Sequence, residues 1–177
     1  MVKNRTAALV IALTSTAFAG CSNLQPITSG TEDPCGTLQT IVADYPTGFE
    51  EFRGSSSTFR SVTIYRAKEQ LIKGHCEIWA WGNGDAAYTC TISAPDQSVA
   101  ETLYQRAAAP LAECLGPDWH AEQGPRERDG RPAGERMRFT SSDAAGPAVS
   151  LHRVEDGSRQ SVYLYIGTAA RSPQPTN

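Results

Sequence analysis

The sequence predicts one disulfide-stabilised α+β domain, with antiparallel sheet packed on two helices in the order α-β-β-β-α-β-β-β. Two segments space their apolar residues as helices do, and six others have the apolar alternation or the flanking turns of strands. Consecutive strands joined by short turns pair antiparallel. The order of elements occurs twice, as in a diverged duplication, although no repeat of individual residues supports one.

The first helix is expected to begin at Pro34. The Asp33 side chain can accept hydrogen bonds from the free N–H groups of the first turn, and proline suits the first helical position because no partner is needed there for an N–H. Pro46 and Gly48 interrupt the helical pattern. The apolar residues at helical spacing are Cys35, Leu38, Ile41, Val42 and Tyr45.

Three strands are expected next, after a break at Gly54 and the serines that follow it. They lie at residues 58–67, 75–80 and 87–92. The Gly-Asn-Gly sequence at 82–84 is a hairpin signal between the second and third strands. A three-residue loop there would place Cys76 opposite Cys90 and give one face of the hairpin a core pattern.

The second helix is expected at residues 96–108, continuing past a kink at Pro110 until Gly116 ends it. Residues 116–135 are rich in glycine, proline and charged residues, which indicates a long loop. Arg126, Arg128, Arg131 and Arg136 alternate here with acidic residues, a pattern typical of a solvated loop. Binding of an anion or of a partner is the alternative. Three further strands are expected at residues 136–140, 148–154 and 160–168.

Four cysteines lie within the expected domain, an even number that would form two disulfides if the chain is exported from the cytoplasm. Three connectivities are open to them. The hairpin register favours a bridge between Cys76 and Cys90, and the helix ends favour one between Cys35 and Cys114. A zinc site is the competing interpretation, but the C-x₂-C spacing of such sites is absent. No metal or other cofactor is therefore expected.

The N-terminus has the pattern of a secretory signal. Lys3 and Arg5 precede an apolar run at residues 7–13, and small residues follow it. The apolar stretch is too short to span a membrane. We therefore expect this segment to direct export.

The last four residues of this segment, Phe18-Ala19-Gly20-Cys21, resemble the lipobox of bacterial lipoprotein precursors. The resemblance implies that the Cys21 thiol receives the lipid and that Cys21 becomes the N-terminus of the mature protein. Ser22 follows Cys21 at the position where an aspartate would resemble the inner-membrane retention signal. The absence of that aspartate favours the outer membrane, facing the periplasm. A secreted protein cleaved near Ala19 or Gly20 is the alternative.

The 177-residue chain is then expected to divide into four parts. They are a signal at 1–20, a flexible tether at 21–32, the α+β domain at 33–169 and a disordered tail at 170–177. Removal of Lys3 and Arg5 with the signal takes the net charge from −3 to −5. An acidic chain is a poor nucleic-acid binder, so no nucleic-acid partner is expected.

The expected function is binding rather than catalysis, because the sequence has no G-x-S-x-G, phosphate-binding loop, dinucleotide glycine motif or H-E-x-x-H. The chain is interpreted as a lipid-anchored envelope protein that binds another envelope protein or peptidoglycan. A sharper alternative is an inhibitor or immunity lipoprotein against an envelope-attacking enzyme. A more distant one is an envelope hydrolase that uses His120 or His152.

The candidate binding surface consists of Glu77, Trp79 and Trp81. The other face of the same strand has the core pattern, so the two tryptophans are expected side by side away from the core. Adjacent exposed aromatic residues often mark contact surfaces for proteins or glycans. The alternative is that the tether or residues 116–135 cover them.

Overall fold

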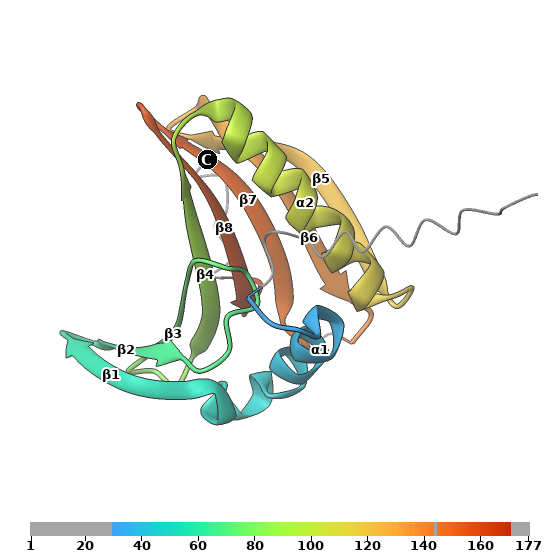
Figure 1. Ribbon diagram of the computed structural model, residues 1–177. Helices are drawn as coiled ribbons and strands as arrows, with labels where there is room; N and C mark the ends of the chain where they lie inside the picture. The colour runs from blue at the N-terminus through green and yellow to red at the C-terminus, as the bar shows by residue number, and fades with distance from the viewer. Residues whose placement is uncertain (1–29, 144, 171–177) are drawn as a thin grey trace, which may run out of the picture.

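The computed structural model describes residues 30–143 and 145–170, which form one eight-stranded sheet and two α-helices (Figure 1). The signal, Cys21 with its lipobox and residues 171–177 lie outside the described residues. The expected antiparallel sheet, two helices and two disulfides are confirmed. In the part of the chain that the structure describes, neither helix has the length and apolar character needed to cross a membrane.

Each half of the described chain begins with an α-helix and continues with four strands. The first half contains α1 (Pro34–Ala43), the short 3₁₀ helices η1 (Tyr45–Thr47) and η2 (Glu50–Phe52), and then β1 (Arg53–Phe59), β2 (Val62–Ala67), β3 (His75–Trp81) and β4 (Ala86–Ala94). The second half contains α2 (Gln97–Leu115), β5 (Trp119–Arg128), β6 (Arg131–Ser141), β7 (Ala148–Asp156) and β8 (Arg159–Gly167).

The order of strands corrects the sequence prediction. The structure has the order α-β-β-β-β-α-β-β-β-β, with one strand more in each half than expected. The two additional strands, β1 and β5, form the opposite edges of the sheet, whose spatial order is β1-β2-β3-β4-β8-β7-β6-β5. Edge strands border water on one side and are therefore the hardest strands to find from apolar patterns.

β1 occupies the segment that the sequence treats as a break. Every residue of β1 after Arg53 is exposed, so the strand has no apolar alternation that could reveal it. The segment expected as one strand at 58–67 is instead the β1–β2 hairpin, in which Phe59 pairs with Val62. Arg60 takes a positive φ of 56° in the turn between them.

Residues 116–135, expected as a loop, form β5 and the start of β6. The Asp129-Gly130 dipeptide joins these strands, and both residues have positive φ, of 54° and 69°. Asp-Gly favours the two-residue hairpin turns that need this conformation. β5 is mostly exposed, and its register shifts between Pro125 and Glu127. The charged residues of this segment therefore lie along an edge strand.

The sheet has the same topology when followed inward from either edge. Each half supplies a helix and four consecutive antiparallel strands, and the halves meet where β4 pairs with β8. A duplicated helix–strand unit would produce this arrangement. The repeated order of elements is thus matched by a repeated sheet topology, although the residues do not repeat.

The first helix begins at the predicted residue, Pro34, and the second begins at Gln97, one residue after its expected start. Asp33 Oδ1 accepts a hydrogen bond from the Gly36 N–H at 3.0 Å, and Pro34 occupies the first turn of α1. Asp96 Oδ1 accepts one from the Val99 N–H at 2.8 Å and caps α2 in the same way. Each cap satisfies one of the N–H groups that a helix leaves without an internal partner.

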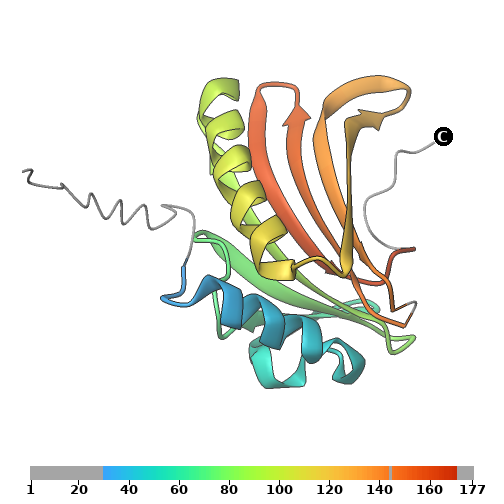
Figure 2. The ribbon, with the colours of Figure 1, turned by 90° about the vertical axis from the view of Figure 1, so that its right-hand side faces the viewer.

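Both helices pack on the same side of the sheet (Figure 2), and the opposite side is named here the helix-free face. α2 continues past Pro110 to Leu115, as expected. The core lies between the helices and the central strands. Its largest fully buried hydrophobic side chains include Tyr88, Tyr104, Phe49, Phe139, Leu38, Ile41, Ile78, Leu151, Leu164 and Ile166.

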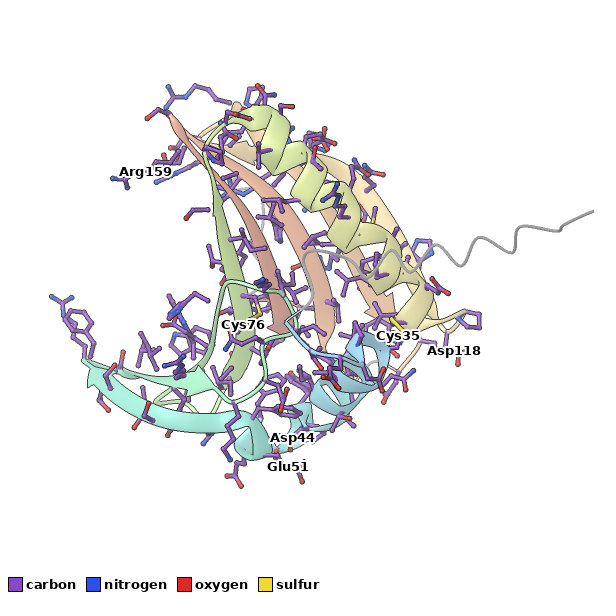
Figure 3. All side chains as sticks on the ribbon, viewed as in Figure 1. Cys35, Asp44, Glu51, Cys76, Asp118 and Arg159 are labelled. Atoms are coloured by element: carbon purple, nitrogen blue, oxygen red, sulfur yellow. A yellow bond between two sulfur atoms is a disulfide. The ribbon has the colours of Figure 1, made fainter. Side chains whose placement is uncertain are left out.

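The two disulfides join the cysteine pairs that the sequence favours. Cys35 in the first turn of α1 bonds to Cys114 in the last turn of α2, and Figure 3 shows Cys35 where the two helices meet. Cys76 on β3 bonds to Cys90, which lies directly opposite on β4. The first bridge cross-links the two halves of the molecule, and the second lies within the first half, buried on the helix side.

Arg153 is a buried cation on the helix side of β7, surrounded by three carboxylates. Its Nε lies 2.9 Å from Glu101 Oε2 on α2, and its Nη2 lies 3.4 Å from Glu135 Oε1 on β6. Glu155 on the same strand is the third partner. Burial alone would lower the pKa of this guanidinium, but the hydrogen bond to Glu155 and the attraction of the three carboxylates raise it. Arg153 thus ties α2 to two strands of the second half.

Arg153→Met is expected to lower the free energy of unfolding by about 2 kcal/mol, because three neighbouring carboxylates lose the cation between them. The loss is smaller than for a fully buried pair, since the glutamates remain partly exposed. Urea denaturation measures it. The matched control is Arg128→Met, because the Arg128–Asp156 pair is exposed on both sides and contributes less than about 1 kcal/mol. Equal losses in the two variants would contradict this role of Arg153.

Candidate functional site

The helix-free face carries aromatic and polar side chains in three rows that cross the central strands. The rows follow from register, because residues directly opposite each other in paired strands point to the same side of a sheet. The first row consists of Ile64, Trp79, Ala87, Gly167, Ala148 and Thr140. The second consists of Arg66, Glu77, Thr89, Tyr165, Ser150 and Arg138. The third consists of His75, Thr91, Tyr163, His152, Arg136 and Gly124.

The structure brings together the three residues of the predicted binding surface. Trp79 and Trp81 lie two residues apart on β3, and their ring centroids are 6.4 Å apart at an angle of 57°. The indole N–H of Trp79 donates to Glu77 Oε2 at 2.9 Å. The other oxygen, Glu77 Oε1, lies 2.7 Å from His75 Nε2. These contacts hold the aromatic pair in one orientation.

Both tryptophans are partly buried, an outcome between the two alternatives considered from the sequence. Residues 119–128, part of the segment proposed to cover them, form β5 at the opposite edge of the sheet from β1. This strand therefore does not cover the aromatic pair. Most of the tether lies outside the described residues.

Small residues beside Trp79 let another aromatic ring lie along the sheet. The Tyr165 hydroxyl donates to the Thr168 carbonyl at 3.0 Å, so its ring runs along its own strand instead of projecting outward. A Cβ at Gly167 would lie only 2.8 Å from that hydroxyl. Glycine at position 167 is therefore required for this packing, which leaves Tyr165 buried.

Tyr163 connects the aromatic pair to the rest of the helix-free face. Burial raises the pKa of its hydroxyl, a hydrogen bond with Thr89 opposes that effect, and the negative charge of Glu77 adds to it. On its other side, the Tyr163 ring lies 6.4 Å from the ring of His152. Tyr163 thus lies between the acidic and the cationic parts of this face.

His152 is buried at the centre of β7, with only 1% of its surface exposed. Its Nε2 is 3.0 Å from Ser150 Oγ, whereas its Nδ1 is buried without a hydrogen-bond partner. Burial, together with the positive charges of Arg126 and Arg136, lowers the pKa of the imidazole to about 4. His152 is therefore neutral near neutral pH.

Three arginines continue this face toward β5, and the sequence groups only Arg126 and Arg136 among them, in a segment expected to be a loop. Arg126 lies on β5, Arg136 and Arg138 lie on β6, and all three are partly buried. Arg126 and Arg136 lie close enough to His152 to lower its pKa. The Asp-Gly dipeptide at 129–130 is the signal that would have found them, because a hairpin there places the two strands side by side.

The two histidines considered for hydrolysis lie apart in the structure. His120 is exposed on β5, and His152 is buried beside Ser150. The Ser150–His152 pair lacks a hydrogen-bond partner at Nδ1, where a catalytic serine–histidine pair has a carboxylate that orients the imidazole. Among residues 30–143 and 145–170, no group of three or more His, Cys, Asp or Glu side chains could hold a metal ion.

The helix-free face therefore has an aromatic pair on β3 and a cationic cluster on β5 and β6. At the usual spacing of strands, β3 and β6 are about 19 Å apart. Comparison with protein-family models, curated proteins and solved structures gives no match for this chain. Function is therefore inferred from the side chains of the helix-free face.

Proposed function

We propose that this protein is a lipid-anchored, non-catalytic component of the bacterial cell envelope that binds a protein or peptidoglycan partner through its helix-free face. The observation that carries the proposal is the contact between Trp79 and Trp81 on a face that neither helix covers. Its lipid anchor is Cys21, in the lipobox-like segment, and the outer membrane facing the periplasm is the proposed location. The two disulfides are compatible with a compartment outside the cytoplasm.

The geometry of the aromatic pair supports binding. Tryptophan combines a large apolar surface with one N–H donor, and it is the residue type most enriched among the residues that dominate interface energies. The hydrogen bond from Trp79 to Glu77 orients the ring before a partner arrives. Such preorganisation reduces the entropy lost on association.

The two alternatives use the same molecule differently. An inhibitor or immunity lipoprotein would use the same aromatic pair against an envelope-attacking enzyme, and a net charge of −5 after removal of the signal would suit a cationic one. An envelope hydrolase would need an accessible nucleophile and base. Ser150 and His152, the serine and histidine that lie within hydrogen-bond distance, are both buried, which favours binding.

Site-specific photo-crosslinking in intact cells tests the binding face. A photoreactive phenylalanine derivative replaces Trp81, and the matched control replaces Arg106, which is exposed on α2 on the other side of the molecule. We expect an adduct from position 81 but not from position 106, and we expect Trp79→Ala to reduce its yield. Identical adducts from both positions, or none from position 81, would remove the helix-free face from the proposal.

The lipid anchor has its own test. Cys21→Ser removes the thiol that would receive the lipid, so the protein is expected to leave the membrane fraction and to appear in the soluble envelope fraction. Cell fractionation followed by immunoblotting measures the change. Ser22→Ala is the control, because it leaves the thiol in place. A Cys21→Ser variant that stays in the membrane fraction would refute lipid anchoring.

A further inference from the structure

The arginine cluster lies on the same helix-free face as the aromatic pair, but toward the opposite edge of the sheet. It consists of Arg126, Arg136 and Arg138. Arg136 is opposite His152 on β7 and opposite Gly124 on β5. A Cβ at Gly124 would lie 4.0 Å from Arg136 Nε, so the guanidinium group extends over a position that has no side chain. Two neighbouring strands thus present their cations on one surface.

None of the three arginines forms an ion pair with a carboxylate. Every Asp and Glu of the chain falls within the described residues, and no ion pair within 4.0 Å involves this cluster. Glu122 is opposite Arg138 in the strand register but forms no such pair. The Nε of Arg138 is buried without a hydrogen-bond partner. Arg153, on the other side of the same sheet, contrasts sharply because three carboxylates surround it.

Electrostatic interactions connect the cluster with its neighbours. Burial and the charge of Arg128 lower the pKa of Arg126, although Asp156 opposes them. The charges of Arg126 and Arg136 act on His152, whose Nδ1 is buried without a partner. Partly buried cations that form no ion pair raise the free energy of the folded state. A bound anion would offset that cost.

We propose that Arg126, Arg136 and Arg138 bind the phosphate group of a ligand on the helix-free face. Guanidinium groups bind phosphate through paired N–H donors. A phosphate monoester carries about −1.5 to −2 charge and three acceptor oxygens, so it offsets more of the positive charge of the three arginines than a carboxylate with one charge and two oxygens. The imidazole of His152 lies at the edge of this site. The phosphate site uses residues other than the aromatic pair, so it does not rest on the proposed function.

Phosphate binding is measured on the full-length protein as the rise in unfolding temperature when inorganic phosphate replaces chloride at equal ionic strength. The test variant is Arg136→Gln/Arg138→Gln, which removes like charges without breaking an ion pair and should therefore fold. We expect it to need about tenfold more phosphate than the wild-type protein for the same rise. The matched control is Arg60→Gln/Arg106→Gln, which makes the same change in net charge at two exposed positions and should bind as wild type does. Equal affinity of the two variants would overturn the proposal.

Nuclear magnetic resonance of the wild-type protein keeps the test independent of variant stability. Inorganic phosphate is expected to shift the imidazole signals of His152 and the Nε–H signal of Arg138. Shifts confined to the exposed arginines, or no shifts, would also overturn the proposal. Trp79→Ala/Trp81→Ala should bind phosphate as wild type does even if it loses the proposed envelope partner, so the two proposals fail separately.

Vesicles identify the source of the phosphate group. Phosphatidylcholine vesicles with and without phosphatidic acid are mixed with the wild-type protein and with Arg136→Gln/Arg138→Gln. Binding that requires both phosphatidic acid and the two arginines assigns the site to a lipid headgroup. Binding of inorganic phosphate without binding to these vesicles assigns it to a soluble phosphorylated compound, and both results support a phosphate site.

Discussion

The double variant Cys35→Ala/Cys114→Ala is expected to lose about 4 to 5 kcal/mol of unfolding free energy, the largest effect of any change proposed here. The bridge spans a sequence separation of 79 residues and joins the helices of the two halves. Without it, the unfolded chain gains the conformational entropy of a long open loop. Urea denaturation of the oxidised wild-type protein and of the variant measures the difference.

The second disulfide provides the comparison for the first. Cys76→Ala/Cys90→Ala opens a loop with a separation of 14 residues, for which the same relation gives about 3 kcal/mol. Both of these cysteines are also fully buried, so packing adds to the loss. The slope of the unfolding free energy against urea concentration separates the two cases. Only the long bridge strongly restricts the unfolded chain, so removal of that bridge should make the slope steeper. An unchanged slope for Cys35→Ala/Cys114→Ala would contradict the loop-entropy explanation.

Acidification is expected to destabilise the protein through His152. The pKa of its imidazole is about 4 in the folded protein and about 6.5 in an unfolded chain, so the unfolded state takes up the proton first as the pH falls. Above pH 6.5 the imidazole is neutral in both states, and the free energy of unfolding is not reduced. Between pH 6.5 and pH 4 the free energy of unfolding falls progressively, because the unfolded state is protonated first. The shift corresponds to roughly 3 kcal/mol.

The His152→Gln variant isolates this contribution from those of the carboxylates. Glutamine can still reach Ser150, which lies 3.0 Å from His152 Nε2, but it has no charge to gain. Its free energy of unfolding should fall less steeply between pH 6.5 and pH 4 than that of the wild type. His120→Gln, at an exposed position, should follow the wild-type curve. A direct titration of the His152 ring by nuclear magnetic resonance completes the test, and a midpoint near 6.5 would contradict burial as the cause.

Several features of the fold could be predicted because short-range chemistry determines them. Asp33 caps α1 through an N–H group three residues away. The Gly-Asn-Gly sequence at 82–84 specifies the hairpin that places Cys76 opposite Cys90. Alternation along β3 then places Trp79 and Trp81 on the same face, which is the predicted part of the candidate site.

The edge strands could not be predicted from apolar patterns. β1 has exposed residues on both sides, so nothing in its composition distinguishes it from a loop. β5 is also mostly exposed, and for that reason it is rich in charged residues. Only pairing with β2 and β6 makes these segments strands, since their backbone groups find partners there.

The amino-acid sequence by itself determined the start of the first helix, the central hairpin, the favoured disulfide pairs and the alternation that brings two tryptophans together. The tertiary structure alone decided which charges are paired. Arg153 is enclosed by carboxylates from α2, β6 and β7, whereas Arg126 and Arg136 lie near His152 and form no ion pair. The reason is physical: a hairpin or a cap depends on neighbours a few residues away, but the field at a guanidinium depends on groups brought close from distant parts of the chain.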